Sequence, residues 1–263
     1  MDNFKKIYLI AMDVFHSSTS DRLMYGLLIL ALLFIATANV PFANQRFMEF
    51  QDPLVSAKQL GFSGINIFLL LISIFVSLGT LQSFLNKDRL ILILSKPVRR
   101  WQLFSGIISG LFFIVLINLI VMTLGLWLII FMHTREPNLN IFLGMGIMFV
   151  VAAIYISFVC FFYTFFPNAL SGILAFIMAV AGFSSTNITN LIEGAFSGLF
   201  LKGAKLGILI LPKINALWAI YLRTTQTLYV ETDYSSIHIL FHTMALLLCV
   251  NLISILRFSL KKE

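Results

Sequence analysis

The chain has 263 residues, of which 60% are hydrophobic and only 11% are charged. A soluble domain of this size could not cover its surface with so few charges, so the lipid bilayer must be the solvent for much of the chain. The net charge of +7 does not indicate a nucleic-acid partner, because the basic residues lie beside apolar segments, as they do in membrane proteins. Cys160 and Cys249 both lie inside apolar segments and do not support a disulfide framework.

The N-terminal segment 1–22 differs from the apolar segments that follow it. In residues 2–16, apolar side chains recur at helical spacing on one face, and the charged residues lie off that face. A helix of this kind lies in the membrane interface rather than crossing the membrane. The polar residues 17–20 then make the turn into the first span, where Asp21 is placed to cap the helix. The apolar face consists of Phe4, Ile7, Tyr8, Ala11, Val14 and Phe15.

Six apolar segments are long enough to cross a membrane, since a span needs about 20 residues at a rise of about 1.5 Å each. These segments are 23–41, 63–85, 105–132, 141–165, 169–186 and 237–257. The first ends in an Ala-Thr-Ala sequence typical of a signal-peptidase site, but its length and the acidic residues before it favour a retained helix. We therefore predict an all-α polytopic membrane protein with six transmembrane helices in a single domain, 1–263.

The segment 187–236 does not have the pattern of a further span. A span here would carry Pro212 and Lys213 near its middle, and it would place the basic C-terminal residues outside. We predict an external excursion with short helices that dip into the outer leaflet, where four glycines at small-xxx-small spacing permit close packing. An ordinary glycine-rich surface loop is the alternative, and the sequence does not decide between the two.

The distribution of Lys and Arg predicts the orientation. With the N-terminus inside, the short cytoplasmic segments hold most of the 18 basic residues, Arg89 among them, whereas the longer external loops are nearly neutral. Cytoplasmic loops of membrane proteins carry this excess, so we expect both termini in the cytoplasm. The basic residues expected outside are Arg46, Lys58, Arg135, Lys202, Lys205, Lys213 and Arg223.

The predicted spans show no catalytic pattern. No acidic residue lies near the middle of a span, which disfavours a proton relay or an intramembrane aspartyl protease. His238 and His242 share a helix face, but no carboxylate or thiolate lies within that turn, so we assign them to the outer headgroup region rather than to a metal. Gly198 and Gly203 have the spacing of a phosphate-binding loop, but Ala204 follows where that motif needs lysine. We therefore expect neither an enzyme nor a nucleotide-binding motif on this chain.

The segment 86–104 joins the second and third spans on the predicted cytoplasmic side. Polar residues lead into an apolar run of five residues, 90–94, which is too short to cross a membrane. Pro97 then interrupts the chain, and a basic pair follows. The apolar run needs burial, which a protein partner could supply. Alternatively, the run lies in the lipid interface and the basic residues contact anionic headgroups. Composition alone leaves these two alternatives even.

The sequence Ser95-Lys96-Pro97-Val98-Arg99-Arg100, followed by Trp101 and Gly106, resembles the cytoplasmic segment of ABC-2 type transporter permeases. The similarity is to the compact six-span branch that includes the copper-processing and gliding-motility permeases. In that family, an N-terminal elbow helix precedes the first span, and short external re-entrant helices join the fifth and sixth spans. The loop between spans two and three forms a coupling helix that docks in a groove of the ATPase. Segments 1–22, 187–236 and 86–104 correspond to these parts.

Two departures from the family pattern are visible. The residue after Gly106 is often lysine in the family and is Ile107 here, and the usual acidic residue before the apolar run is represented only by Asp88. The resemblance implies a permease subunit in the bacterial inner membrane that pairs with a second copy as a homodimer. Two copies of a separate ATPase, which carry ATP and Mg, would bind beneath it, and this chain would hold no cofactor. Export of a hydrophobic or amphipathic substrate is the implied process.

The resemblance also implies which residues couple to the ATPase. The run 90–94 would be the buried contact, Pro97 the bend, and Lys96, Arg99 and Arg100 the polar or charged contacts. The two arginines have an alternative role as positive-inside anchors. The complete set is Leu90, Ile91, Leu92, Ile93, Leu94, Ser95, Lys96, Pro97, Val98, Arg99 and Arg100.

A second function remains open from the sequence: a membrane anchor or assembly factor that holds a larger complex without transport. A membrane enzyme that acts on lipids is disfavoured, because the spans lack polar and acidic residues.

Overall fold

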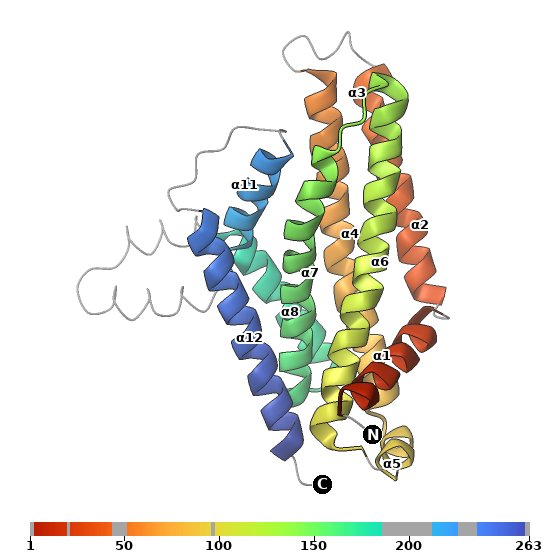
Figure 1. The fold of residues 1–263 in the computed structure, drawn as a ribbon, viewed down its shortest axis with the longest axis vertical. Helices are drawn as coiled ribbons and strands as arrows, with labels where there is room; N and C mark the ends of the chain where they lie inside the picture. The colour runs from red at the N-terminus through yellow and green to blue at the C-terminus, as the bar shows by residue number, and fades with distance from the viewer. Residues whose placement is uncertain are drawn as a thin grey trace, which may run out of the picture.

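The computed structural model describes residues 3–19, 22–43, 52–95, 98–185, 212–225 and 236–260. Within these ranges every regular element is a helix, which confirms the predicted all-α class (Figure 1). In chain order the elements are α1 (Asn3–Thr19), α2 (Arg22–Ala36), the 3₁₀ helix η1 (Thr37–Asn39), α3 (Val40–Ala43), α4 (Pro53–Phe84), α5 (Lys87–Leu94), α6 (Arg100–Thr134), α7 (Asn140–Phe165), α8 (Asn168–Phe183), α11 (Ile214–Thr224) and α12 (Ser236–Leu260).

Among the described residues, five helical segments are long and apolar enough to cross a bilayer, so the chain is a multi-pass membrane protein, as predicted. α8 begins close to where the fifth predicted span, 169–186, begins, but it ends at Phe183 and has only 16 residues. At about 1.5 Å per residue it is about 24 Å long, which is shorter than the ~30 Å apolar core of a bilayer. The five longer segments are Arg22–Ala43, Pro53–Phe84, Arg100–Thr134, Asn140–Phe165 and His238–Leu260.

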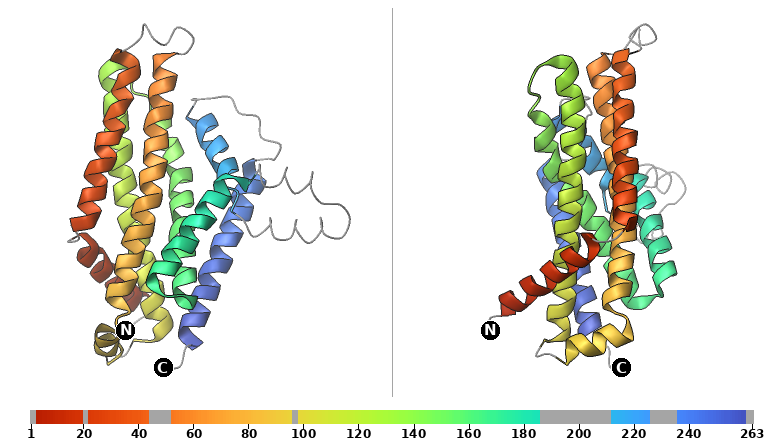
Figure 2. Two further views of the ribbon diagram at one scale, coloured as in Figure 1. Left: turned by 180° about the vertical axis from the view of Figure 1, so that it is seen from behind. Right: turned by 90° about the vertical axis from the view of Figure 1, so that its right-hand side faces the viewer.

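The helices form an elongated bundle, with α2, α4, α6, α7 and α12 running roughly along its long axis (Figure 1). α1 begins and α12 ends at one end of the bundle, where α5 also lies. We call this the lower end, as drawn in Figure 1, and the opposite end the upper end. α1 crosses the bundle obliquely near the lower end and projects from it in the side view (Figure 2).

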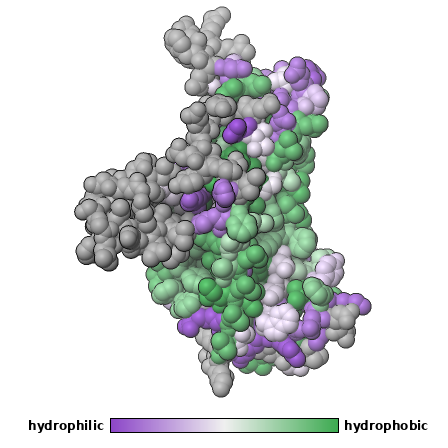
Figure 3. Space-filling view, turned by 60° about the vertical axis from the view of Figure 1, so that its left-hand side comes forward, coloured by the Kyte–Doolittle hydropathy of each residue, from purple (hydrophilic) through white to green (hydrophobic). Residues whose placement is uncertain are grey.

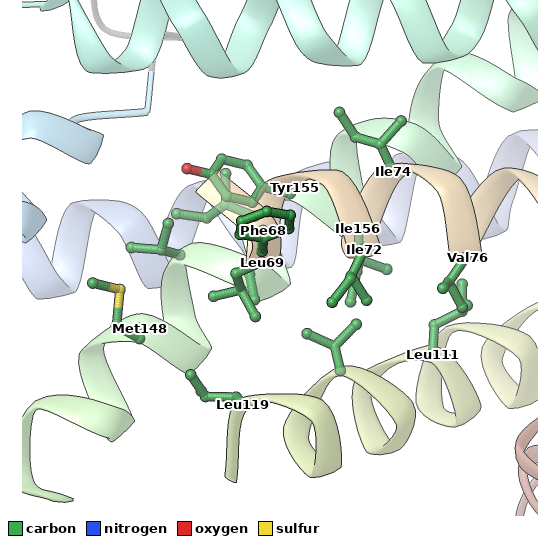
Figure 4. Close-up of a cluster of buried hydrophobic side chains, with 14 of the residues drawn as sticks. Phe68, Leu69, Ile72, Ile74, Val76, Leu111, Leu119, Met148, Tyr155 and Ile156 are labelled. Carbon is green, nitrogen blue, oxygen red and sulfur yellow. The ribbon is translucent and has the colours of Figure 1, made fainter. Parts of the chain in front are cut away.

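The centre of the bundle is built by α4 and α7, and its edges by α2 and α12. In the most apolar part of each helix, 67% of the α4 residues and 61% of the α7 residues are buried, against 22% for the α2 segment and 17% for α12. In the core, Phe68 of α4 lies beside Tyr155 of α7, and Val76 of α4 lies beside Leu111 of α6 (Figure 4). On the face shown in Figure 3, a broad apolar region lies between hydrophilic side chains at the two ends, as expected for a surface covered by lipid, and some hydrophilic side chains also lie at intermediate height.

α4 begins at Pro53, well before residue 63, where the second span was predicted to start. Asp52 caps the helix by accepting the backbone N–H of Leu54 at 3.0 Å, and Pro53 takes the first helical position. Lys58 therefore lies inside a helix, and its predicted place in an external loop is wrong. It is only 4% exposed, and its Nζ donates to the carbonyl oxygen of Thr225, just after α11, at 3.4 Å. A buried ammonium group needs such an acceptor.

α11 is the described helix of the predicted excursion 187–236; residues 186–211 and 226–235 lie outside the described residues. Ile214, Leu217 and Tyr221 are buried, and α11 packs against α7, α8 and α12. The ring of Tyr221 meets Phe62 of α4 edge-on, with centroids 4.7 Å apart. For residues 214–224, the alternative of an ordinary surface loop is therefore wrong, because the segment is a helix packed into the bundle.

α1 is helical, as predicted, but the apolar face expected to lie in the membrane interface is divided in two. Ala11 and Val14 are buried against the bundle. Phe4 and Tyr8, which were assigned to the same face, are 84% and 59% exposed. The single interfacial face is thus corrected: one stripe of α1 packs on protein, and a separate apolar stripe remains on the outside.

Candidate functional site

The segment 86–104, which was predicted to contact an ATPase, forms the lower end of the bundle. α5 lies across this end rather than along the long helices (Figure 1, Figure 2). It begins where the carbonyl of Asn86 accepts the N–H of Leu90 at 2.8 Å, and it ends where the N–H of Ser95 donates to the carbonyl of Ile91 at 3.0 Å. Lys96 and Pro97 lie outside the described residues, so the bend at Pro97 stays a prediction.

The apolar run of α5 is divided between the bundle and the outside. Leu90 is half-buried and packs against the hydrophobic core, and so does Val98 beyond the helix. Ile91 is 68% exposed, and Ser95 and Arg99 are exposed as well. The expectation that the run needs burial from outside is therefore corrected for Leu90, because the chain's own core covers it. Three side chains lie outside the described part of the structure: Leu92, Ile93 and Leu94.

Arg89 joins α5 to two other helices. Its guanidinium lies 3.8 Å from the centroid of the Phe84 ring, donates to Ser83 Oγ at 2.9 Å and reaches Asp13 Oδ2 of α1 at 3.5 Å. Because both charged side chains are partly exposed, the ion pair contributes about 1 kcal/mol or less. Charge counting identifies Arg89 only as one of the cytoplasmic basic residues. No local pattern pairs it with Asp13, which lies far earlier in the chain.

The start of α6 is held by Gln102. Its Oε1 accepts the backbone N–H of Arg99 at 2.9 Å, and its Nε2 donates to Asn3 Oδ1, at the start of α1, at 2.8 Å. Gln102 is 1% exposed, so these bonds satisfy a buried amide. The two arginines of the predicted site differ: the Arg99 side chain is exposed, whereas Arg100 is half-buried. Arg99 is therefore the more exposed of the two, whereas part of Arg100 lies against the bundle.

Two glycines of α6 form the surface on which α1 packs. A methyl group placed on Gly110 would lie 2.6 Å from Val14 Cγ1 and 2.9 Å from the carbonyl oxygen of Ala11. A methyl group on Gly106 would lie 2.7 Å from Ile10 Cβ. Small residues at this spacing let two helices approach closely. Gly106, which is part of the resemblance to the permease family, thus has a packing role in this chain.

The described ranges hold no group of three His, Cys, Asp or Glu side chains placed to bind a metal ion. His238 is exposed and His242 is half-buried on α12.

No protein-family model matches the chain, and no curated protein matches it significantly. The resemblance to ABC-2 permeases therefore rests on the residues of segment 95–106 and on the order of the segments around it.

Proposed function

We propose that this chain is the permease subunit of an ABC-2 type transporter and that a separate ATPase docks on α5. The observation that carries the proposal is α5 itself, a short helix between two long apolar helices that lies across the end of the bundle (Figure 1). It exposes Ile91, and the Ser-Lys-Pro sequence follows it. An exposed helix face of this kind suits a groove on a partner. In this proposal ATP and Mg bind to the ATPase.

The contacts that join α5 to α4 and α1 support a role for α5 in transmitting movement. Arg89 links α5 to α4 through Ser83 and to α1 through Asp13. α1 packs closely on α6 at Gly106 and Gly110. A displacement of α5 would therefore move α1 and the lower parts of α4 and α6 together, as rigid elements.

We place the lower end in the cytoplasm and count six crossings, with α8 as the fifth. The excess of Lys and Arg in the segments at this end supports the orientation. Local thinning of the bilayer, which costs only a fraction of a kcal/mol per Å of mismatch, accommodates a helix about 24 Å long. α1 serves as the elbow helix, with its outer stripe in the interface. Two copies form a homodimer that exports a hydrophobic or amphipathic substrate.

The docking of an ATPase is tested by changing the exposed face of α5. Tagged protein is purified from native membranes, and mass spectrometry measures the ATPase recovered per permease, identified by its nucleotide-binding motifs. Ile91→Asp is expected to lower this ratio about tenfold or more, because a carboxylate buried in the contact lacks a partner. The matched control is Leu139→Asp at the upper end, where the native side chain is 63% exposed. An unchanged ratio for Ile91→Asp, or no such ATPase with the wild type, would refute the proposal.

The orientation is tested by labelling single cysteines in a background without Cys160 and Cys249. Ser95 and Glu136 are both exposed, at the lower and the upper end respectively. A membrane-impermeant maleimide is expected to label Glu136→Cys in intact cells, and Ser95→Cys only after permeabilisation. Labelling of both variants in intact cells would contradict the six-span topology.

A further inference from the structure

A partly enclosed cavity of about 220 Å³ lies at the lower end, bounded on one side by α5. Its walls come from the adjoining ends of α4, α5, α6, α7, α8 and α12, so six helices meet around it. Leu90 and Phe258 contribute apolar surface. The polar part of the wall consists of Arg100, Tyr163, Thr164 and Asn168.

The walls of this cavity are held by contacts within the chain. Asn168 Nδ2 donates to Gln82 Oε1 of α4 at 2.6 Å, which fixes the start of α8. Phe258 of α12 stacks on Phe104 of α6, with ring centroids 4.9 Å apart. The cavity is therefore formed in advance, as binding sites for small ligands usually are.

The polar wall favours an anion. Arg100 is a permanent cation, and none of the described residues that line the cavity is acidic. α8 begins at Asn168 without a side-chain cap from Pro167, so the N–H groups of its first turn add positive potential. Tyr163 and Thr164 add hydroxyl groups to the same wall, and a hydroxyl can donate a hydrogen bond to an anion.

The cavity lies where the apolar surface of the bundle meets its polar lower end. Phe166 lines the cavity and is 42% exposed, and the Arg257 guanidinium lies 4.2 Å from the centroid of the neighbouring Phe165 ring. Aromatic and basic side chains of this kind are typical of the headgroup region. Exposed apolar residues continue from Phe166 along α8 at helical spacing, a surface suited to acyl chains: Leu170, Ile173 and Ile177.

We propose that this cavity binds the phosphate-bearing headgroup of a membrane lipid. Arg100, the cation that lines the cavity, contacts the phosphate. The acyl chains lie outside, along α8. The volume supports a headgroup rather than a larger compound, since drug-sized ligands occupy about 300–1,000 Å³. The proposal needs the lower end to meet a membrane surface but needs no ATPase, so it is independent of the proposed function.

The test is a titration of the delipidated, full-length protein in detergent with phosphatidylglycerol, followed by native mass spectrometry. Arg100→Gln is expected to weaken binding about tenfold or more, because it removes a charge-assisted contact. The matched control, Lys5→Gln, removes one exposed positive charge from α1 at the same end. It is expected to change affinity by less than about twofold, because exposed charges are screened by salt.

Equal affinity for the wild type and Arg100→Gln would overturn the proposal. Equal losses in Arg100→Gln and Lys5→Gln would overturn it too, because they indicate surface electrostatics alone. Glycerol 3-phosphate has the phosphate but no acyl chains; binding as tight as that of the lipid would assign the cavity to a soluble phosphate instead. If Arg100→Gln does not fold, Thr164→Leu fills the cavity without changing charge. It is expected to abolish lipid binding, and wild-type affinity in that variant would also overturn the proposal.

Discussion

α1 and α11 are two helices too short or too polar to be spans, and each is seated against glycines of the bundle, yet their surroundings differ. α1 packs mainly on α6, at Gly106 and Gly110, and also touches α4. α11 is wedged among α7, α8 and α12. On α8, a methyl group added to Gly182 would lie 2.6 Å from Ile214 Cδ1 and 2.9 Å from the carbonyl oxygen of Pro212.

Polar links also join each of the two helices to the bundle. α1 is tied near both of its ends, by the bond from Gln102 to Asn3 and by a buried 3.0 Å hydrogen bond between the hydroxyls of Ser18 and Thr80. α11 has a described polar link to the long helices at its C-terminal end, from Lys58. A helix that packs mainly on one neighbour can shift away from it, whereas a helix packed among several cannot shift without displacing them. We therefore expect the packing of α11 to be less tolerant of added volume than that of α1.

The largest loss of stability is expected from a substitution where α8 contacts the start of α11. Gly182→Ala forces apart the backbones of α8 and the segment that leads into α11, and we expect a loss of about 2–3 kcal/mol of folding free energy. Unfolding in mixed SDS micelles measures it. Gly146→Ala on α7 is the control, because no atom lies within 4 Å of the added methyl group. It should be neutral or stabilising by up to about 1 kcal/mol, since alanine favours a helix. Equal stability of the two variants would remove the evidence for a wedge.

A smaller effect is expected where α1 meets α6. Gly110→Ala brings a methyl group against Val14 and the carbonyl of Ala11. α1 packs mainly on α6 here and can shift outward, so we expect a loss of about 1–2 kcal/mol. The same unfolding assay measures it, together with faster proteolysis of the N-terminal segment. Gly26→Ala on α2, where the added methyl group meets nothing within 4 Å, serves as the control. A loss larger than that of Gly182→Ala would show that the α1–α6 contact tolerates added volume less well than the α11–α8 contact.

The smallest effect is expected at the ion pair that ties α5 to α1. Arg89→Ala removes the contacts to Phe84, Ser83 and Asp13, and we expect a loss of about 1 kcal/mol. Asp13→Asn alone should cost about 0.5 kcal/mol or less. A double-mutant cycle of these two substitutions measures the coupling between them. No coupling energy would mean that Arg89 does not link α5 to α1.

Helix positions were predictable wherever hydropathy alone decides them. The predicted third and fourth spans, 105–132 and 141–165, lie within α6 and α7 and miss only a few terminal residues. The start of α4 was missed because Lys58 lowers the local hydropathy, although the chain buries it against the carbonyl of Thr225. Asp52 followed by proline was the available signal, since this pair is typical of a helix start.

The candidate site was predictable as a segment but not as a set of contacts. The run 90–94 and the Ser-Lys-Pro sequence identify it, because a short apolar run between two spans is a local pattern. Which side of α5 faces the core depends on where the ends of the other helices lie. Leu90 is covered by the bundle and Ile91 is not, although both are equally apolar in the sequence.

The sequence by itself determined that this is a helical membrane protein and roughly where its long helices lie. These properties follow from the hydropathy of consecutive residues. The tertiary structure alone decided that Lys58 is buried, that Arg89 reaches Asp13 and that α1 divides its apolar residues between α6 and the outside. It also brought six helix ends together around the cavity at the lower end. Each of these depends on residues distant in the chain, whose approach is set by the packing of whole helices.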